Sequence, residues 1–507
     1  MSSLFTLRNP NIKKLVAYSK DLRNLNSIGG LLAWDQETYL PSKGAYARAC
    51  QMETLSTLQY EKATTKRLGS LLVQLQEDIS LSPSDFTISD KALVKLMQRD
   101  YLLATKLSKK LVGALSKHTS LSLEMWKHAR NQNAFSFFEA SLARMVELKR
   151  EVAYAYGFTQ SPYDALLSEY EDGLDTKTVA KVFDTLLPVL TPLAAKLRDK
   201  TVSWDEGVFQ KTYDEKILWS VTLKLLAKLG FDLESGRQDQ STHPFTVGIS
   251  AQDVRLTTRV LSTQPVSTIL SSVHEAGHGM YEQGVSLDLT QTRLGQIDSL
   301  VIHESQSRFF ENMIGKSQEF WEYFFPVLYA AFPKQLAGIT DHEAWKEVNI
   351  VRPSLIRVDA DEVTYHFHIA IRFLIERQLI EGALLAKDVP EMWRTLYKKY
   401  LNVDVPDDLH GALQDIHWSQ GLIGYFPTYS LGSFLSVQIF DTLEKSHADL
   451  KKDIKTGSFD PVRKWLGQEI HQHGQSYSSD EVATRVTGMS LSPDSFIRYI
   501  KHKFDLV

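Results

Sequence analysis

Apolar residues recur at intervals of three and four along most of this chain, which is the spacing of one face of an α-helix. The pattern is clear in "NIKKLVAYSKDLRNLNSIGGLLAW" (11–34) and "FFEASLARMVELKREVAYAYG" (137–157). The same spacing continues through six further segments, 91–117, 178–199, 215–230, 317–331, 363–385 and 433–451. Proline and glycine, 16 and 26 in number, lie mostly between these segments. The sequence therefore predicts a mainly α-helical protein.

The predicted helical segments show no sign of belonging to separate domains. The chain has 507 residues, of which 43% are hydrophobic, and this is ample material for a large buried core. No repeat period, low-complexity tract or obvious interdomain linker interrupts it. We expect a single domain that spans residues 1–507.

Charge and cysteine content exclude several classes of function. The 57 basic and 61 acidic side chains give a formal net charge of −4, and no segment carries a dense basic block. Nucleic acid and anionic membranes are therefore not expected as partners. Cys50 is the only cysteine, which rules out an internal disulfide and a zinc site built on several thiolates. Neither a signal peptide nor a membrane span is apparent, so we expect a soluble cytoplasmic protein.

One stretch departs from the helical pattern. In "HPFTVGISAQDVRLTTRVL" (243–261), Val254, Leu256, Thr258 and Val260 alternate with polar neighbours, as in a half-buried strand. The segment "FTVGIS" just before them is a candidate partner strand. We expect a small antiparallel sheet directly ahead of the most informative helix.

That helix contains "SSVHEAGHGMYEQG" (271–284) and is predicted to begin near Pro265. His274 and His278 lie one turn apart and point the same way, so that both imidazoles can reach one zinc ion. A zinc ion would lower the pKa of a bound water to about 7, and Glu275 could accept its proton. The alternative is an ordinary amphipathic helix that carries these letters by chance.

A catalytic zinc site needs a third protein ligand and one open position. A third histidine six residues after His278 is excluded, because position 284 is glycine. The segment "DSLVIHESQSRFFEN" (298–312) offers Glu304, whose carboxylate would be costly to bury without a cation beside it. Glu311 is the rival ligand, although it lies farther from the start of this helix. His303 would point about 100° away from Glu304 and is not expected to bind the metal.

Five motifs in this order give the chain a resemblance to the thermostable-carboxypeptidase family of HEXXH metallocarboxypeptidases. They are "DVRLT" (253–257), "HEAGH" (274–278), "HESQ" (303–306), "IRVDAD" (356–361) and "GALQDIHW" (411–418). The segment "LLAWDQETYLP" (31–41) also looks like the N-terminal signature of the family, so the resemblance covers nearly the whole chain.

The resemblance implies a mainly α-helical saddle of the gluzincin type, with a deep groove and the small antiparallel sheet beside the metal. Angiotensin-converting enzyme and the thimet-type oligopeptidases have a similar shape. It also implies a homodimer, and one zinc or cobalt ion per chain that serves to remove single residues from peptide C-termini. By the match of motifs, the metal ligands are His274, His278 and Glu304, and the general base is Glu275.

The resemblance leaves the orientation of the imidazoles open. The residue four after the third ligand is Arg308, where thermolysin-like proteins have an acid that orients a ligand histidine. Asp298, Asp253 and Asp361 are the candidates for this role, and the sequence does not rank them.

A carboxypeptidase must also bind the free carboxylate of its substrate, and a guanidinium group matches a carboxylate in shape and charge. Arg357 is the first candidate and Arg255 the second. The competing interpretation of Arg357 is a structural ion pair with Asp359, Asp361 or Glu362. For Arg255 it is simple exposure or pairing on the predicted strand.

The oxyanion that forms during peptide hydrolysis needs hydrogen-bond donors. The segment "QDIHWSQGLIGYFPTYSLG" (414–432) supplies His417 and Tyr425 as catalytic candidates and Tyr429 as a substrate-binding candidate. Each of them could instead be an ordinary packed side chain. Asp415 either orients His417 or caps a helix.

Other residues of these segments are expected to have packing roles. His366 and His368 lie on a helical pattern near acidic residues, and we interpret them as packing or groove-lining side chains. Trp34, with Tyr39 and Pro41, most simply forms a packed helix end.

These observations predict a metal-dependent carboxypeptidase that cleaves the last peptide bond of peptides with a free C-terminus. An endo-oligopeptidase or dipeptidyl carboxypeptidase on the same zinc scaffold is the first alternative. The second alternative is a non-catalytic helical interaction protein with a vestigial metal site. It does not account for Glu275, because a purely structural site needs no base beside an open coordination position. The preferred terminal residue, the native metal and the dimer interface do not follow from the sequence.

Overall fold

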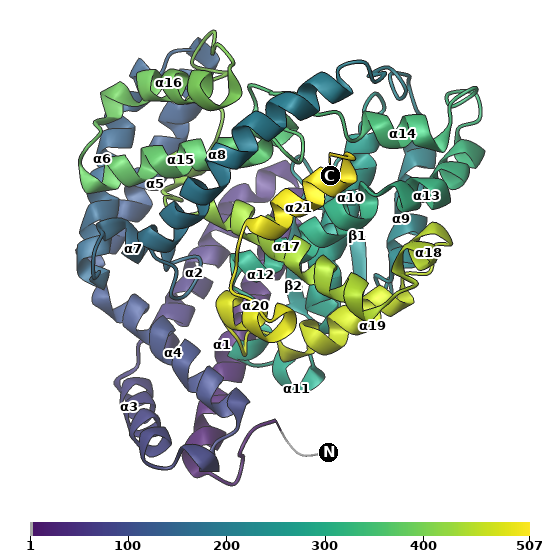
Figure 1. Ribbon diagram of the computed structural model, residues 1–507. Coiled ribbons are helices and arrows are strands. Elements are labelled where there is room, and N and C mark those ends of the chain that lie inside the picture. Colours follow the sequence, from purple (N-terminus) through teal and green to yellow (C-terminus); the bar gives the residue numbers. More distant parts are fainter. Residues whose placement is uncertain (1–3, 507) are drawn as a thin grey trace. The chain divides into compact units, whose positions relative to one another are not determined.

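The predicted helical segments are helical in the computed structural model, which describes residues 4–506. Figure 1 shows the elements coloured in chain order, from purple at the N-terminus to yellow at the C-terminus. The pattern over 91–117 belongs to two helices, because Ser108 caps a new helix by accepting a hydrogen bond from the backbone of Leu111. The pattern over 433–451 likewise spans the end of one helix and the start of another.

Backbone contacts divide the chain into two compact units. Unit 1 contains the described residues of Met1–Thr105, together with Glu206–Val348 and Ile439–Ser490. Unit 2 contains Lys106–Asp205, Asn349–Gln438 and the described residues of Leu491–Val507. The boundary at residues 438 and 439 falls inside helix α17 (Pro427–Ser446). A single catalytic domain over the whole chain stays a prediction.

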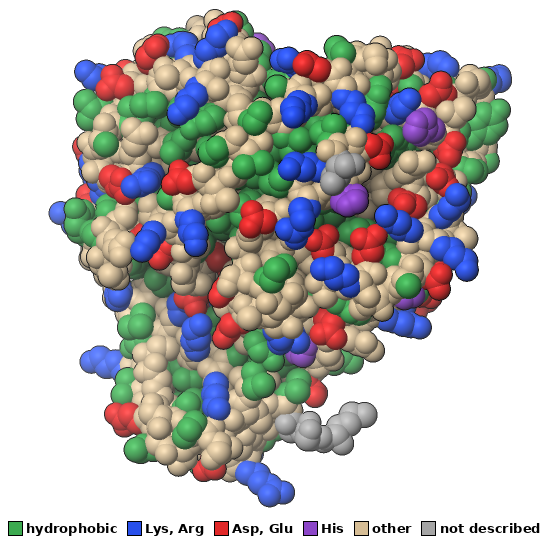
Figure 2. Space-filling model, in the orientation of Figure 1, with side chains coloured by type: hydrophobic (Ala, Val, Ile, Leu, Met, Phe, Trp, Pro, Cys, Tyr) green, Lys and Arg blue, Asp and Glu red, His purple; other side chains and the backbone are tan. Residues whose placement is uncertain are grey.

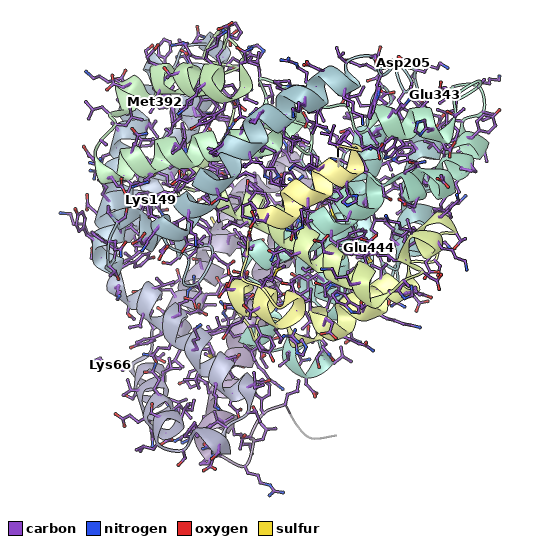
Figure 3. All side chains as sticks on the ribbon, in the orientation of Figure 1. Lys66, Lys149, Asp205, Glu343, Met392 and Glu444 are labelled. Carbon is purple, nitrogen blue, oxygen red and sulfur yellow. The ribbon has the colours of Figure 1, made fainter. Side chains whose placement is uncertain are left out.

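Unit 1 consists of helices around one small sheet. Its helices are α1 (Pro10–Thr38), α2 (Ala45–Ala63), α3 (Lys66–Leu81), α4 (Ile88–Lys106), α9 (Glu215–Leu229), α10 (Pro265–Gly284), α11 (Leu287–Thr290), α12 (Leu300–Arg308), α13 (Gln318–Ala331), α14 (Asp341–Glu347), α18 (Leu450–Lys455), α19 (Asp460–Glu469) and α20 (Ser479–Thr487). Short 3-10 turns lie at η1 (Ser42–Gly44), η2 (Pro83–Asp85), η3 (Arg293–Gly295) and η8 (His471–His473), and a π-helical turn at η4 (Phe309–Gly315). Glu343, labelled in Figure 3, completes a capping box with Thr340 at the start of α14.

The sheet of unit 1 has three strands, β1 (Gly236–Gln240), β2 (Thr246–Ser250) and β3 (Asp253–Thr258), in the order β1-β3-β2. The predicted antiparallel pair is confirmed, with Thr246 opposite Leu256. The expectation of a purely antiparallel sheet is wrong, because β1 pairs parallel to β3 with Gly236 opposite Val254. Strand β1 was not predicted, because its segment "GRQDQ" has no alternation of apolar and polar residues. Its buried polar side chains are held by hydrogen bonds instead: Gln238 donates to Thr222 at 3.2 Å.

Helix α10 packs against β3, β2, α12 and η4. Two glycines of "HEAGHG" allow this close packing. A Cβ atom at Gly277 would lie 2.5 Å from the carbonyl oxygen of Gln306 in α12, and one at Gly279 would lie 2.7 Å from Leu256 in β3. The motif therefore fixes how closely α12 and the sheet approach this helix, in addition to supplying its histidines.

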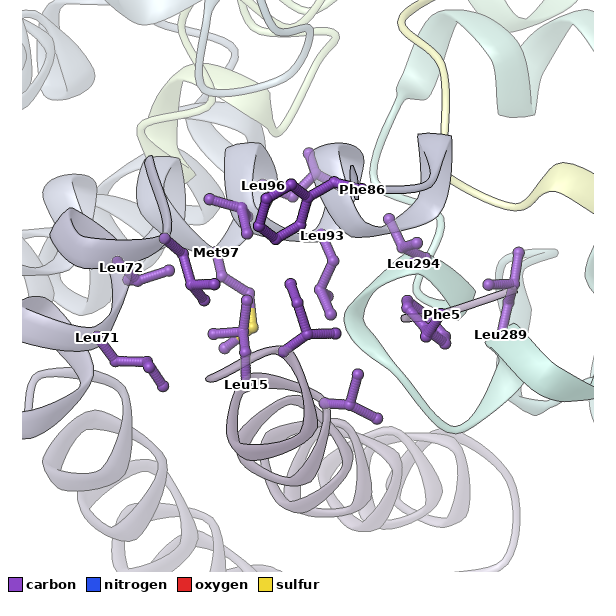
Figure 4. Close-up of a cluster of buried hydrophobic side chains, with 14 of the residues drawn as sticks. Phe5, Leu15, Leu71, Leu72, Phe86, Leu93, Leu96, Met97, Leu289 and Leu294 are labelled. Carbon is purple, nitrogen blue, oxygen red and sulfur yellow. The ribbon is translucent and has the colours of Figure 1, made fainter. Parts of the chain in front are cut away.

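A separate apolar cluster of unit 1 joins helices α1, α3 and α4 to residues near α11 and η3 (Figure 4). Its members include the fully buried Leu15, Leu72, Leu75 and Leu93, together with Leu294. Burial of a leucine side chain stabilises the folded state by about 1.5–3 kcal/mol. This cluster anchors α1, which contains residues 31–38 of the segment "LLAWDQETYLP".

Unit 2 is helical. Its helices are α5 (Lys109–Gln132), α6 (Ser136–Tyr156), α7 (Pro162–Leu167), α8 (Thr176–Thr201), α15 (Tyr365–Glu381), α16 (Val389–Leu401) and α21 (Asp494–Lys503), with short turns at η5 (Arg357–Asp359), η6 (Ala386–Asp388) and η7 (His417–Gln420). Lys149 of α6, labelled in Figure 3, forms a buried ion pair with Glu169 at 2.6 Å.

Among the described residues, α8 alone is long and apolar enough to cross a membrane by length and composition. Its Phe183, Leu186 and Leu190 are buried, and α8 packs against α7, α15, α16 and α21. Packed helices of globular proteins pass the same test, so this finding is weak evidence for a membrane span.

On the face shown in Figure 2, acidic and basic side chains are interspersed.

Candidate metal centre and active-site residues

Three predicted ligands converge in unit 1. His274 and His278 extend from one face of α10, and their Nε2 atoms lie 3.7 and 3.6 Å from Oε2 of Glu304 on α12. A tetrahedral zinc ion with bonds of about 2.0–2.1 Å separates its ligand atoms by about 3.4 Å. The triad therefore fits one divalent metal ion. Within residues 4–506 no other set of three or more His, Cys, Asp or Glu side chains has this spacing.

Glu311 lies on the other side of the first imidazole. Its Oε2 is 2.8 Å from Nδ1 of His274, whereas Glu304 faces Nε2. Glu311 is thus the partner that orients the ring, and the rival assignment as a metal ligand does not suit its position. It belongs to the π-helical turn η4, whose wider winding breaks the regular helical spacing that would relate it to Glu304.

The three carboxylates that the sequence offered for orienting a metal-binding imidazole have other partners. Asp298 pairs with Arg293 in unit 1. Asp253 pairs with Arg255 at 2.9 Å, and Asp361, in unit 2, accepts the backbone N–H groups of Val363 and Thr364 near the start of α15. Each has a local partner and none is hydrogen-bonded to His274, so these three candidates for orienting that ring are replaced by Glu311.

Two cations keep Glu311 ionised. Burial alone would raise the pKa of this carboxyl, but Arg308 at 3.1 Å and Lys316 at 3.4 Å outweigh it, so that the pKa lies well below the ordinary value. An ionised carboxylate only accepts hydrogen bonds, so Nδ1 of His274 is the donor. Nε2 then carries the lone pair and faces Glu304, so it would be the atom available to a metal ion.

The two ligand histidines have different surroundings. Burial lowers the pKa of His274, but the carboxylates of Glu304 and Glu311 raise it above the ordinary value. Burial, followed by the neighbouring imidazoles of His303 and His274, lowers the pKa of His278 well below the ordinary value. Both effects describe the metal-free protein.

His303 packs on one of the candidate ligand histidines, and its role outside the metal site stays a prediction. Its ring stacks on His278 with centroids 4.3 Å apart, and its Nε2 lies 3.1 Å from Oε1 of Glu282. These contacts restrict rotation of the His278 ring.

Glu275 is buried beside the ligand histidines, with 5% of its surface exposed. Thr246 on β2 donates a hydrogen bond of 2.6 Å to its Oε2. Burial raises the pKa of Glu275, while His274 and Thr246 act in the opposite direction. Sequence reasoning missed Thr246, although it predicted the strand that carries it.

A second cluster lies in unit 2 and is centred on Asp415. This carboxylate accepts hydrogen bonds from Arg357 at 3.0 Å and from Arg372 of α15 at 2.6 Å. Burial raises the pKa of Asp415, but the two guanidinium groups lower it well below the ordinary value. Arg357 is therefore ion-paired, as the competing interpretation held, but with Asp415 and not with Asp359, Asp361 or Glu362.

Gln414 links the two arginines to the surrounding chain. Its Oε1 accepts from the backbone of Arg357 at 2.9 Å and from Arg372 at 2.7 Å. The "QD" of "GALQDIHW" thus supplies the amide and the carboxylate that hold both arginines. Sequence reasoning missed Arg372 and Gln414, since no local spacing relates them to Arg357.

This cluster carries a surplus positive charge, because two guanidinium groups share one carboxylate. The nearby His417 does not change the balance at neutral pH, since burial lowers its pKa to about 4. The surplus suits the binding of one anion.

The structure brings the remaining unit 2 candidates together. Ring centroids of His417 and Tyr425 are 5.5 Å apart, those of Tyr425 and Tyr429 are 5.2 Å apart, and the Arg357 guanidinium lies 5.3 Å from the Tyr429 ring. Asp415 does not hydrogen-bond to His417, because 4.0 Å separates Oδ1 from Nδ1. The suggestions that Asp415 orients this ring or caps a helix are wrong, since its oxygens bind the arginines.

Arg255 lies in unit 1 and has partners of its own. It forms two hydrogen bonds with Asp253, and its guanidinium stacks 4.3 Å from the ring centroid of Trp34. Trp34 is itself buried and lies 5.5 Å from Tyr39, ring to ring. The packed helix end expected of "WDQETYLP" therefore also covers the predicted strand.

His366 and His368 are packing residues. Both are buried, and their Nδ1 atoms lie 3.0 Å from the Ser430 hydroxyl and 2.9 Å from the Tyr397 hydroxyl. Neither approaches a cluster of metal-binding groups among the described residues.

A helical frame, a small sheet, a two-histidine and one-glutamate triad and a buried carboxylate beside it together define a metal-dependent hydrolase. Comparison with known proteins identifies the family. The chain belongs to the carboxypeptidase Taq (M32) metallopeptidase family, whose model matches residues 14–504. The protein is accordingly a metal-dependent carboxypeptidase, a peptide hydrolase.

Individual relatives cover almost the entire chain. Thermostable carboxypeptidase 1 of Pyrococcus furiosus is 35% identical over 499 residues, 98% of this chain and 99% of its own length. Thermostable carboxypeptidase 1 of Thermus thermophilus is 35% identical over 503 residues, 97% of this chain and 98% of its own length. The crystal structure of the M32 carboxypeptidase from Deinococcus radiodurans superposes with a TM-score of 0.93 at 33% identity, covering 98% of this chain and 99% of that one.

Proposed function

We propose that this carboxypeptidase uses a zinc or cobalt ion held by His274, His278 and Glu304 to release single residues from peptide C-termini. The observation that carries the proposal is the triad itself, with its donor atoms within 4.8 Å of one another. Two imidazoles and one carboxylate suit zinc and cobalt, whereas magnesium prefers oxygen ligands alone. The bound metal supplies a Lewis acid that lowers the pKa of water and polarises the carbonyl group.

Glu275 is the proposed general base. It accepts a proton from the attacking water and then delivers it to the nitrogen of the leaving residue. Thr246 holds the carboxylate by its 2.6 Å hydrogen bond, which leaves the other oxygen, Oε1, available for the proton. The raised pKa of Glu275 makes the carboxylate a stronger base than an exposed glutamate.

His417 and Tyr425 are the proposed donors to the oxyanion of the substrate. A side chain that stabilises this negative charge contributes typically 2.7–4 kcal/mol to lowering the activation barrier. The pKa of about 4 keeps His417 neutral at pH 7, so it acts as a hydrogen-bond donor without a charge of its own.

Arg357 is the proposed site for the substrate carboxylate, with Tyr429 beside it. The surplus positive charge around Asp415 supports this assignment, because one bound carboxylate would neutralise the cluster. Arg255 remains the second candidate, because its one-to-one pair with Asp253 leaves no surplus positive charge for a substrate carboxylate.

The setting of the enzyme is also proposed. We infer a homodimer in the cytoplasm that acts on free peptides and binds neither nucleic acid nor membrane. The low net charge of −4 supports the absence of nucleic-acid and membrane partners, and the single cysteine supports a reducing compartment. The homodimer is what the family resemblance implies.

One experiment tests the reaction. A peptide blocked at its N-terminus is supplied with its C-terminus either free or amidated, and the products are identified by mass spectrometry. Release of one residue from the free form alone supports the proposal. Cleavage of both forms indicates an endo-oligopeptidase, and release of a dipeptide indicates a dipeptidyl carboxypeptidase.

The same assay tests the two arginines and the metal. Replacement of Arg357 by Ala should raise KM for the free peptide, with a loss on the order of 2–5 kcal/mol of binding. Arg255→Ala is the matched control, and a larger rise of KM in Arg255→Ala than in Arg357→Ala would transfer the assignment to Arg255.

A chelator should abolish activity, and added zinc or cobalt should restore it. Full activity in excess chelator would contradict the metal mechanism.

A further inference from the structure

A buried carboxylate in unit 2 has no part in the reaction as proposed so far. Glu376 lies on α15 and is 0% exposed. Its Oε2 accepts hydrogen bonds from the Tyr163 hydroxyl at 2.6 Å and the Gly424 backbone N–H at 2.9 Å. Its Oε1 accepts from the indole N–H of Trp418 at 2.8 Å. One side chain thus joins α7, η7 and the loop after η7 to α15.

Two of these three donors adjoin the residues proposed to stabilise the oxyanion. Trp418 directly follows His417, and Gly424 directly precedes Tyr425. The segment from 417 to 425 is therefore attached to Glu376 close to both of its ends.

The backbone at Gly424 depends on this attachment. Its φ of +95° lies in the left-handed region, which glycine adopts without strain. A Cβ atom there would lie 2.8 Å from the backbone of Leu166 on α7. The loop consequently runs directly against α7, and the N–H of Gly424 turns towards Glu376.

Stability alone does not require a carboxylate at this place. Among residues 4–506, no Lys, Arg or His side chain is hydrogen-bonded to Glu376, and burial raises its pKa to about 7. A hydrophobic residue of similar volume often packs equally well without the cost of desolvating a charge. What only an acceptor with two oxygens provides is a fixed position for three donors from three segments.

We infer that Glu376 is a positioning residue that fixes His417 and Tyr425 by anchoring their neighbours Trp418 and Gly424. This inference rests on the proposed roles of His417 and Tyr425. Glu376 itself is buried and does not touch the substrate.

The first test is Glu376→Gln, which keeps the size of the side chain but replaces one acceptor oxygen by an amide donor. We expect kcat for an N-blocked peptide to fall by 10- to 100-fold. KM should stay within about twofold, because Arg357 and the metal ligands are untouched. Glu381→Gln, on the same helix and paired with the exposed Arg377, is the matched control and should leave both constants unchanged.

A double-mutant cycle separates positioning from general destabilisation. If Glu376 acts through Tyr425, the Glu376→Gln change costs much less kcat in a Tyr425→Phe background than in the wild type. The inference would be overturned if, in the cycles with Tyr425→Phe and with His417→Ala, the fold-loss of kcat in the double variant equals the product of the fold-losses in the two single variants. Trp418→Phe removes one donor without touching the carboxylate, and it replaces Glu376→Gln in the cycles if that variant does not fold.

The same variants distinguish a failure of the proposed oxyanion roles from a failure of the inference about Glu376. If Tyr425→Phe and His417→Ala both keep full kcat, the oxyanion roles are wrong, and the positioning role of Glu376 is overturned with them. If these single variants are impaired but Glu376→Gln has normal kcat, only the inference about Glu376 fails.

Discussion

At the scale of single residues, the candidate metal centre depends on partners that lie outside the HEXXH motif. Glu311 holds Nδ1 of His274, and Thr246 holds Oε2 of Glu275. Hydrogen-bonded partners of this kind fix the tautomer and rotation of a ligand before the metal binds. They explain how two flexible side chains can be ready for a metal ion and a proton.

Replacement of Glu275 by Gln should leave metal binding intact and remove turnover. The amide cannot accept a proton, and general-base catalysis is worth about 10²- to 10⁴-fold in rate. Metal content, measured by atomic absorption, and kcat are compared with those of the wild type. Near-normal turnover in a variant with full metal content would remove Glu275 from the mechanism.

Replacement of Glu311 by Gln should weaken metal binding by about 10- to 100-fold, as is typical when a partner of a ligand histidine is lost. The variant removes the negative charge that pairs with His274, Arg308 and Lys316. Affinity is measured by competition with a chromophoric chelator. Asp253→Asn serves as the control, because Asp253 pairs with Arg255 and should not affect the metal. Equal affinities of the two variants would contradict the role of Glu311.

At the scale of elements, the centre is made by the close approach of α10 to α12 and η4. Gly277 permits this approach, and the π-helical turn η4 brings Glu311 to the His274 ring. The sequence predicted α10 from its apolar stripe, and it predicted a helix within residues 298–312, where α12 lies. It did not predict the π-helical turn, because no local pattern in "FFENMIG" distinguishes it from an α-helix.

A methyl group at Gly277 should push α12 away from α10. The new Cβ would lie 2.5 Å from the Gln306 carbonyl oxygen, so we expect a loss of about 1–3 kcal/mol in unfolding free energy, together with weaker metal binding. Urea denaturation and chelator competition measure the two effects. Gly467→Ala in α19 is the control, since nothing lies within 4 Å of its Cβ position, and it should stabilise by about 0.5–1 kcal/mol.

At the scale of the whole molecule, buried titratable groups link stability to pH. Glu376 has a folded pKa of about 7 against an ordinary value of 4.5, whereas His417 has about 4 against 6.5. The acid favours the folded state when protonated, and the histidine favours it when neutral. Their effects on the free energy of unfolding therefore oppose each other between about pH 4 and 7.

The contribution of Glu376 is fully present below pH 4.5 and is lost as pH rises through 7. A shift of this size corresponds to about 3 kcal/mol. The stability of the wild type relative to Glu376→Gln should therefore fall by an amount of this order between pH 4.5 and 8. Urea denaturation across this range measures it. A constant difference between the two proteins would show that Glu376 does not titrate with a raised pKa.

The sequence by itself determined the helical class, the antiparallel strand pair and the two histidines on one face of α10. These features depend on local periodicity: a four-residue spacing puts two histidines on one helix face, and alternation marks a half-buried strand. Motif resemblance added the arginine, histidine and tyrosine candidates, because it compares residues that are far apart in the chain.

Only the tertiary structure decided which charged groups meet. Glu311 and not Asp298 orients His274, Asp415 and not Asp359 pairs with Arg357, and the polar segment "GRQDQ" forms a strand. Each outcome depends on partners from distant segments, whose approach is set by packing of the helices. A buried polar group takes whichever partner the packing brings within hydrogen-bond distance, and spacing along the chain does not specify that partner.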